Sequence, residues 1–346
     1  MTLRPLRLAA AAAAAVALAL AAAPAAARVL EVGPGRAYPA PAAAAAVAQD
    51  GDTVAIVAGS YFDCAQWHAS GLTIAGPPNG ENGPLVTITD KACAGKAAFV
   101  IGGDGVTVRG ISFERIRVPD GNGAGIRAEG RDLTVLDSRF VNDQIGILAG
   151  GSGGFLKIAG TRFTGNGASF DGRPTHAVLA GALDLLRIEH SDFQQARGGD
   201  HVVSDARRTE LVADHFADAG GHMSGPLVWV NGGALLLEGS TVDLAGGAAD
   251  RPGAVLVTGD ADTLTVRGNT LAEPDGHVPL LRNWSSAAAI AAANTVPPNA
   301  DAVSDSGATY HRLRSRIAGL RDLARDLART VRHQVADLAR GWKLVP

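Results

Sequence analysis

Apolar and polar positions alternate along this chain in short runs, and the same run returns at a nearly constant interval. Each copy has a stretch rich in Val, Ile and Leu, then a small or charged pair, then a bulky residue. Alternation with a period of two is typical of β-strands that bury one face. The bulky residues that close the copies are Phe113, Phe140, Phe163, Phe193, Phe216, Val242 and Leu271. Their spacings are 27, 23, 30, 23, 26 and 29 residues.

A repeat of this length indicates a solenoid, because a single unit cannot bury its apolar face and is stabilised by stacking on its neighbours. Two or three short strands per turn in a constant order stack most simply as parallel sheets, and parallel crossovers are almost always right-handed. The sequence therefore predicts an all-β, right-handed parallel β-helix with one internal column of phenylalanines. A propeller blade needs about 40 to 45 residues. Leucine-rich repeats need a helix in each unit, for which the Gly-rich breaks leave no room.

Before the repeats stands a segment of a different kind, residues 1–27. It carries Arg4 and Arg7, then an apolar stretch of 16 residues, Leu8 to Ala23, and then an Ala triplet. This layout is typical of a cleaved secretory signal peptide. The alternative, a retained membrane anchor, is disfavoured because a span needs about 20 apolar residues. We therefore expect an exported, soluble chain that starts near Arg28, in the periplasm or outside the cell.

The repeats themselves occupy residues 28–290, the predicted β-helix domain. A short Ala-rich helix, Pro39 to Gln49, is expected to cover its first end, because end coils expose apolar surface and unpaired edges. Residues 291–308 are rich in Ala, Pro, Asn and Asp and are interpreted as a linker. Residues 309–343 carry apolar side chains at steps of three and four, which predicts a C-terminal amphipathic α-helix.

This predicted helix is basic, since nine Arg and Lys against three Asp leave a net charge of plus six. Three roles stay open for it: a cap on the solenoid, self-association through its apolar seam, or contact with an anionic membrane surface. A cap or a self-association helix is favoured, because a stripe of Leu is most often buried.

Charge and cysteine content disfavour some classes of protein. Charged residues make up 19% of the chain and the formal net charge is −3, which argues against a nucleic-acid partner. Two cysteines, Cys64 and Cys93, favour a disulfide in an exported chain, since two thiolates cannot complete a zinc site. The sequence holds no zinc signature, P-loop or nucleophile elbow, so we expect neither a metal nor a cofactor.

Two stretches resemble a known family. They are VGPGRAYPAPAAAAAVAQDGDTVAIVAGSYFDCAQW near the start and VPDGNGAGIRAEGRDLTVLDSRFVNDQIGILAG in the middle. With the coils, they make the chain similar, over residues 30 to about 285, to the exported bacterial right-handed parallel β-helix proteins of the pectate-lyase-like superfamily. The resemblance implies contact with carbohydrate, because members include polysaccharide lyases, uronate epimerases and non-catalytic binding proteins. The paired carboxylates of a calcium-dependent lyase are not seen in the sequence.

Candidate chemistry concentrates between Thr175 and His222. Lyase chemistry on a uronate requires a base for the C5 proton, a cation for the carboxylate and an acid for the leaving oxygen. His176 and His201 are 25 residues apart, about one turn, so they are expected on adjacent rungs of one outer face. Either is a predicted base. Arg207 is the predicted partner of a substrate carboxylate.

Arg208, Asp205 and Trp229 are predicted to contact the substrate, the tryptophan by stacking on a sugar ring. A structural interpretation stays open beside this one, in which the histidines decorate a solvated face and the arginines pair with Asp200, Asp205 and Glu210. The leading functional hypothesis is thus a polysaccharide lyase or uronate epimerase that contacts acidic polysaccharide. The alternative is a non-catalytic envelope or adhesive β-helix.

Overall fold

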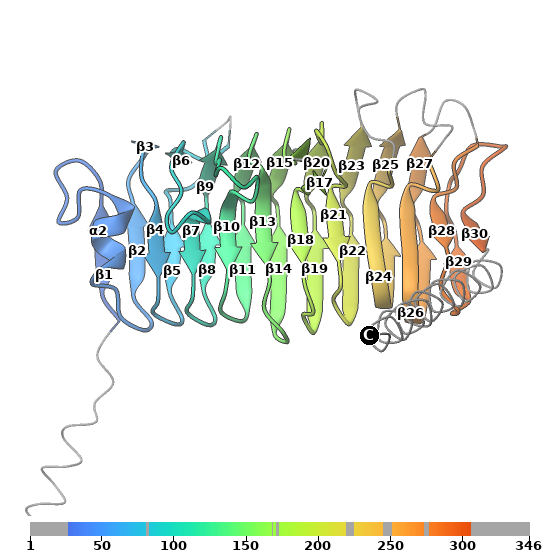
Figure 1. The fold of residues 1–346 in the computed structure, drawn as a ribbon, viewed down its shortest axis with the longest axis horizontal. Helices are drawn as coiled ribbons and strands as arrows, with labels where there is room; N and C mark the ends of the chain where they lie inside the picture. The colour runs from blue at the N-terminus through green and yellow to red at the C-terminus, as the bar shows by residue number, and fades with distance from the viewer. Residues whose placement is uncertain are drawn as a thin grey trace, which may run out of the picture.

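The computed structural model describes residues 27–80, 83–167, 169–170, 173–218, 225–244, 251–272 and 277–305. These residues wind into a parallel β-helix, in which each coil lies against the next along one axis (Figure 1). The all-β solenoid predicted from the repeat is confirmed. No helix among these residues is long and apolar enough to cross a membrane.

Most coils contribute two strands to one sheet and a third strand to another. The larger sheet contains β1 (Val29–Val32), β2 (Thr53–Ile56), β4 (Ala65–Trp67), β5 (Thr73–Ala75), β7 (Ala97–Ile101), β8 (Thr107–Arg109), β10 (Ala124–Ala128), β11 (Leu133–Leu136), β13 (Ile145–Ala149), β14 (Phe155–Ala159), β18 (Val178–Ala180), β19 (Leu185–Glu189), β21 (Val202–Ser204), β22 (Arg208–Val212), β24 (Val228–Glu238), β26 (Val255–Arg267), β28 (Leu281–Asn283), β29 (Ala289–Ala292) and β30 (Val303–Asp305).

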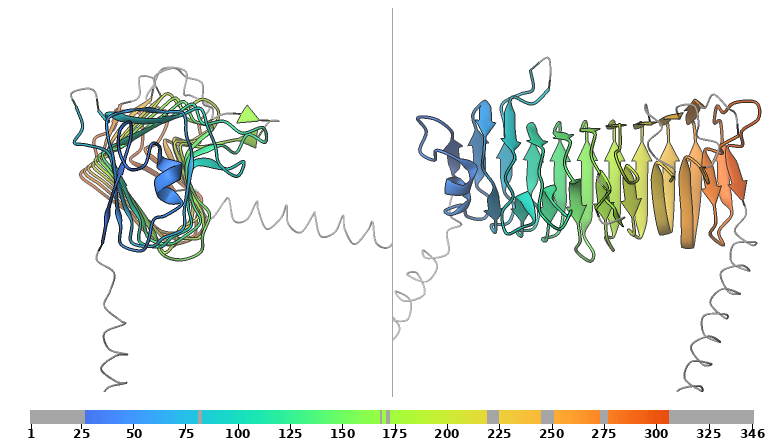
Figure 2. Two further views of the ribbon diagram at one scale, coloured as in Figure 1. Left: turned by 90° about the vertical axis from the view of Figure 1, so that its left-hand side faces the viewer. Right: turned by 45° about the horizontal axis from the view of Figure 1, so that its top comes forward.

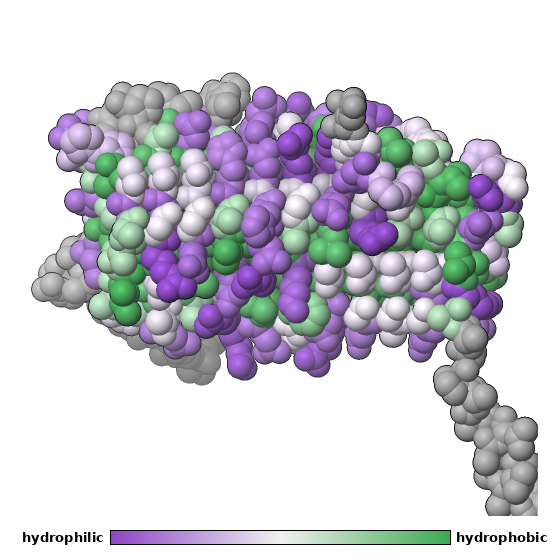
Figure 3. Space-filling view, turned by 180° about the vertical axis from the view of Figure 1, so that it is seen from behind, coloured by the Kyte–Doolittle hydropathy of each residue, from purple (hydrophilic) through white to green (hydrophobic). Residues whose placement is uncertain are grey.

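The smaller sheet contains β3 (Gly59–Tyr61), β6 (Val86–Thr89), β9 (Ile111–Glu114), β12 (Arg139–Val141), β15 (Arg162–Thr164), β20 (Asp192–Gln194), β23 (His215–Asp218), β25 (Thr241–Leu244) and β27 (Thr270–Ala272). A short antiparallel hairpin of β16 (Ser169–Phe170) and β17 (Arg173–Pro174) projects from one coil. Seen from behind, pale side chains form regular rows and hydrophilic ones gather over the middle of the solenoid (Figure 3). Such rows are expected when equivalent positions repeat in register.

The predicted phenylalanine column is confirmed in the smaller sheet. Phe113, Phe140, Phe163, Phe193 and Phe216 pair rung by rung and are at most 1% exposed. Successive rings stack with centroids 4.5 to 5.1 Å apart. Each such pair contributes about 0.5–1.5 kcal/mol beyond the burial of its area. The column therefore fixes the register of every coil that it passes through.

A ladder of buried polar side chains fixes the sharp corner that precedes this column. At each rung the backbone N–H of one coil donates to the side-chain oxygen of the next coil. The members are Ser138, Thr161, Ser191, Asp214, Ser240, Asn269 and Asn294. The residue before each is in the left-handed conformation, for example Asp137 with a φ of 48° and Gly160 with 58°. The ladder satisfies backbone donors that the turn would leave unpaired inside the protein.

The two ends differ from the expectation in detail. The cap helix α2 spans Pro41–Ala45, shorter than the predicted Pro39 to Gln49, and lies across the first coil (Figure 2). Residues 291–305, expected as a linker, instead continue the solenoid, because β29 pairs with β26 and β30 pairs with β28. The predicted disulfide between Cys64 and Cys93 is confirmed and links neighbouring coils.

The predicted signal peptide and C-terminal amphipathic helix lie outside the described residues, except for Ala27. The three roles considered for the helix, including membrane contact and self-association, thus stay predictions.

Asp214 provides a test of the polar ladder. It is 2% exposed, its Oδ2 has no partner among the described residues, and burial raises its pKa to about 7. Because this folded-state pKa lies above the ordinary 3.8, the free energy of unfolding falls as the pH rises from about 4 to about 7. Asn269 shows that an amide fits the ladder, with Nδ2 donating to Leu237 O at 2.9 Å.

We therefore expect Asp214→Asn to raise the free energy of unfolding by about 1–3 kcal/mol at pH 8 and to flatten this pH slope. Urea denaturation across the pH range measures both effects. Asp243→Asn, at an exposed position of β25, is the matched control and should change neither. An unchanged slope in Asp214→Asn would contradict the account of the ladder.

Candidate functional site

One outer surface of the larger sheet brings together three of the six predicted catalytic and substrate-binding residues. The register pairs Val178 with Val202 and Val202 with Val228, so residues that flank β18, β21 and β24 form outward rows. We call this surface the candidate face, and define it by His176, Leu179, Asp200, Val203, Asp205, Trp229 and Asn231. Neighbouring rungs in such rows stand about 4.8 Å apart.

His201 is not on the candidate face, which corrects the prediction of two outward histidines. Since Val178 pairs with Val202, the residue opposite His176 is Asp200, one position before His201. The His201 side chain is 1% exposed and packs between Phe193 and Phe216. Its Nε2 contacts Ala217 O at 3.0 Å, and burial lowers its pKa to about 4. This one-residue shift sends a side chain from one face of a strand to the other.

Asp200 takes the place beside His176 that the sequence analysis gave to His201. The backbone N–H of Asp200 donates to His176 Nδ1 at 3.1 Å, and Asp200 Oδ2 lies 3.6 Å from the same nitrogen. The two side chains are 14% and 10% exposed. Because Nδ1 accepts a hydrogen bond, the neutral imidazole carries its proton on Nε2. In this tautomer the Nε2–H of His176 is a hydrogen-bond donor.

Burial shifts the pKa values of this pair in opposite directions. It lowers the pKa of His176 below its ordinary value and raises the pKa of Asp200 to about 7. A carboxyl group with such a pKa exchanges its proton readily at neutral pH, which is what general acid–base catalysis requires. Perturbed groups near a surface are candidates for function, although structural networks also produce them.

A buried ion pair belongs to the surroundings of Asp200. Arg251 and Asp218 contact each other through Nη2 and Oδ2, with side chains 3% and 2% exposed. Arg251 Nη1 also donates to Gly225 O at 2.8 Å. The positive charge of Arg251 opposes the effect of burial on Asp200 and lowers the pKa of that carboxyl. The amino-acid pattern did not point to Arg251, which lies 51 residues after Asp200 and outside the repeated runs.

Trp229 and Asp205 occupy the candidate face as predicted, and a chain of hydrogen bonds links them. Trp229 Nε1 donates to Thr258 Oγ1 at 2.8 Å, and Thr258 Oγ1 donates to Asn231 Oδ1 at 3.2 Å. Asn231 Nδ2 then donates to Asp205 Oδ1 at 3.0 Å. Because the indole is 38% exposed and its N–H is held, its ring presents a fixed apolar surface. An aromatic ring beside polar groups suits one face of a sugar.

Arg207 and Arg208 lie past the turn that follows β21, beside an open groove of about 750 Å³. Arg207 is 83% exposed, with Nε 3.6 Å from Asp184 Oδ1, and Arg208 pairs with Glu210. The pairing of arginines with carboxylates, the structural interpretation of the sequence, is confirmed for Arg208 and Glu210. Four Asp residues line the groove, which reduces its attraction for a polyanion. The structure thus separates both arginines from His176.

Within the described ranges, no group of three or more His, Cys, Asp or Glu side chains is placed to hold a metal ion.

Comparison with known proteins reveals a common fold. No family model and no curated protein matches the sequence. Among solved structures, an alginate lyase from Paenibacillus sp. str. FPU-7 is 14% identical, with a TM-score of 0.52, and the match covers 81% of this chain and 98% of that one. The predicted resemblance to right-handed parallel β-helix proteins is confirmed at the level of the fold.

Two further matches have TM-scores below 0.5. Pectate lyase Pel9A is 14% identical with a TM-score of 0.48, covering 81% of this chain and 80% of that chain. A pectin methylesterase from Aspergillus niger is 14% identical with a TM-score of 0.41, covering 83% and 87%.

The protonation of Asp200 can be measured directly. We expect its side-chain carboxyl carbon to titrate with a midpoint of about 7 in a ¹³C NMR series, because burial disfavours the charged form. The Asp200→Asn variant identifies the signal by its absence. A midpoint below 5 would show that water reaches this carboxyl freely in solution.

Proposed function

We propose that this chain is an exported β-helix protein that binds an acidic polysaccharide on the candidate face and cleaves it by β-elimination at His176 and Asp200. The observation that carries the proposal is the pairing of these two side chains on adjacent rungs, in the surface that also exposes Trp229. The disulfide between Cys64 and Cys93 supports export, because such bonds persist in oxidising compartments.

The binding part of the proposal rests on Trp229 and its polar neighbours. The indole stacks on a sugar ring, while Asp205 and Asn231 accept and donate hydrogen bonds to hydroxyl groups. Arg127 lies in the same outward row, because it pairs with Leu148, which pairs with Leu179. Its Nε lies 3.4 Å from Glu129 Oε1, and its other N–H groups donate to the carboxylate of a neighbouring uronate. A polysaccharide that covers the candidate face and extends along this row thus meets one cation, the proton-transfer pair and one aromatic ring.

The chemical part assigns one proton to each member of the pair. Deprotonated Asp200 removes the C5 proton of the uronate, and the electrons of that C–H bond form the C4–C5 double bond. The C4–O4 bond breaks, and the leaving O4 takes the proton from His176 Nε2. His176 Nδ1 in turn takes the abstracted proton from Asp200 Oδ2, 3.6 Å away, so the imidazole stays neutral and the carboxylate is regenerated. Because both groups project from one surface, they support elimination more directly than epimerisation, which returns a proton to the opposite side of C5. General acid–base groups of this kind contribute about 10²–10⁴-fold to a rate.

A non-catalytic adhesive or envelope protein is the second candidate function. The pairing of Arg208 with Glu210 and the closeness of Arg207 to Asp184 favour it, since these arginines were the predicted cations for the reacting carboxylate. This candidate retains the binding face around Trp229 and needs no reaction at Asp200.

Activity separates the two candidates. We expect wild-type protein to release unsaturated uronate from alginate or pectate, detected by ultraviolet absorbance, with kcat/KM rising with pH through about 7 as Asp200 loses its proton. Asp200→Asn and His176→Gln should each lower kcat/KM by about 10²–10⁴-fold. His68→Gln, at an exposed position on the first coils, should leave it unchanged. Absence of product on every acidic glycan tested would favour the adhesive protein.

Binding tests the candidate face under either function. Trp229→Ala should weaken the affinity for an oligouronate about tenfold, or about 1.4 kcal/mol, because the stacking surface is lost. Isothermal titration calorimetry measures the Kd, and an unchanged thermal midpoint confirms the fold. Ile290→Ala removes a 63% exposed apolar side chain from β29 and serves as the control. Equal affinities of both variants would place the ligand elsewhere.

A further inference from the structure

The smaller sheet carries an outward row whose middle differs from its ends. Its residues pair from each strand to the next, and their side chains lie on the side of the sheet opposite to the phenylalanine column. Its members in order are Ser60, Thr87, Ser112, Arg139, Arg162, Asp192, His215, Thr241 and Thr270. Three hydroxyl residues precede the middle and two follow it, so the chemistry is confined to four consecutive rungs.

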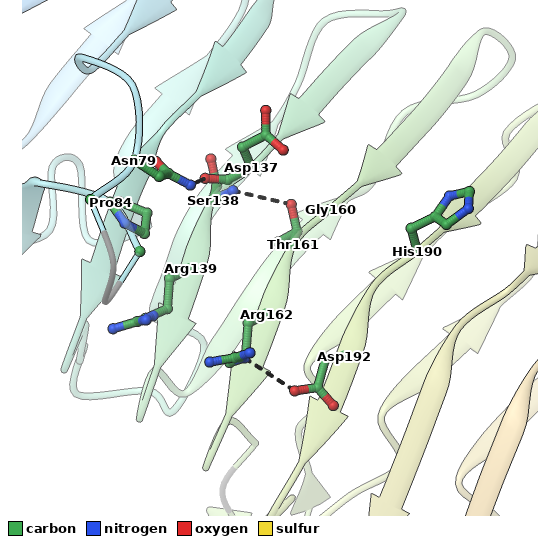
Figure 4. A pocket seen from close by; sticks show the side chains of 12 residues that line it. Asn79, Pro84, Asp137, Ser138, Arg139, Gly160, Thr161, Arg162, His190 and Asp192 are labelled. Atoms are coloured by element: carbon green, nitrogen blue, oxygen red, sulfur yellow. Dashed lines mark hydrogen bonds and ion pairs between the residues drawn. The ribbon is translucent and has the colours of Figure 1, made fainter.

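A groove of about 510 Å³ lies beside these rungs (Figure 4). Its wall is the loop between β5 and β6, which contributes Asn79 and Pro84, and its floor is the corner at Asp137 and Gly160. Asn79 anchors its part of this wall, because its Nδ2 donates to the backbone oxygen of Asp137 at 2.9 Å. This part of the wall is therefore present before any ligand binds.

Arg139 and Arg162 reach into this groove from adjacent rungs, and their side chains extend to the same side in Figure 4. Arg162 contacts Asp192 through Nε at 3.1 Å and is 57% exposed. Arg139 passes close to Gly83, where an added Cβ would lie 2.6 Å from its Nη2. Gly83 has no side chain, which leaves room for the Arg139 guanidinium. The guanidinium groups of Arg139 and Arg162 thus line the same side of the groove.

The negative charge of Asp192 is already compensated. Besides Arg162, it contacts His215 Nδ1 at 2.9 Å and accepts from Gln194 Nε2 at 3.0 and 3.1 Å. These three partners fix the position of the Asp192 side chain, and the Asp192 carboxylate in turn orients the Arg162 guanidinium. A carboxylate with this many partners competes weakly for a further cation, so an anionic ligand can approach the arginines.

We propose that this groove is a second binding site for an anionic oligosaccharide, separate from the candidate face, in which Arg139 and Arg162 each bind a carboxylate. The planar guanidinium matches a carboxylate through two parallel hydrogen bonds. Two such groups about 4.8 Å apart on neighbouring rungs suit carboxylates that repeat along an extended chain of pyranose rings. Thr241, the exposed hydroxyl residue on the rung after the four, offers a partner for a sugar hydroxyl group. The net charge of −3 disfavours nucleic acid as the occupant.

The site goes beyond the proposed function, because it needs neither Asp200 nor Trp229. The second site is tested in Trp229→Ala protein, which lacks the stacking ring of the candidate face. The probe is a short oligogalacturonate, and a neutral cello-oligosaccharide is the ligand control. We expect measurable binding of the charged probe in this background and none of the neutral one. Arg139→Gln and Arg162→Gln should each raise the Kd of the charged probe about tenfold or more.

Arg267→Gln is the matched control, because Arg267 is 54% exposed and pairs with Glu238 on the other sheet. Pro84→Glu gives a second, independent variant that keeps both arginines and adds a like charge to the wall of the groove, and it should weaken binding as well. Thermal midpoints confirm that the variants fold. Unchanged affinity in Arg139→Gln, Arg162→Gln and Pro84→Glu, or no binding of the charged probe in the Trp229→Ala background, would overturn the second site even if the candidate face is active.

Discussion

In-register stacking of parallel coils is the constraint on which the rest of this structure depends. Each backbone rung hydrogen-bonds to the next, so a residue meets its equivalent one turn away, 20 to 34 positions along the chain, at about 4.8 Å. Inside the solenoid, side chains of the same kind therefore stack on one another, as in the phenylalanine column and the corner ladder. Outside, it turns single residues into rows. Function in such a fold is therefore built from rows of side chains rather than from one deep pocket.

The two surfaces discussed use these rows differently. On the candidate face, His176 and Asp200 are largely buried, and the loss of water lowers the pKa of His176 and raises the pKa of Asp200 to about 7. On the smaller sheet, Arg139 and Arg162 are partly exposed and line a groove. Partial burial thus favours proton transfer, whereas exposure favours binding. The same scaffold supports both, because the interior rows hold the register while the outward rows vary.

Much of the fold was predictable from the amino-acid pattern, while the site was predictable only in part. The repeat interval and the Phe positions predicted the coil, and the even Cys count predicted the link between Cys64 and Cys93. Trp229 and Asp205 face outward on the expected coils, and their contact with a substrate stays a prediction. The prediction that His201 faces outward was wrong, since the sequence shows that it lies about one turn from His176 but not which residue of the next coil faces it. Asp200 was passed over for the same reason.

What the sequence determined by itself is the periodicity: apolar positions that recur every turn can be buried only by stacking, and this holds wherever the register falls. The tertiary structure decided the register to the single residue, and with it the face on which each side chain lies. A shift of one position leaves the apolar pattern of a short strand almost intact but exchanges inside for outside. The pKa values of Asp200 and Asp214, and the neighbours of Arg162, depend on that choice, because burial and contact are properties of the folded chain.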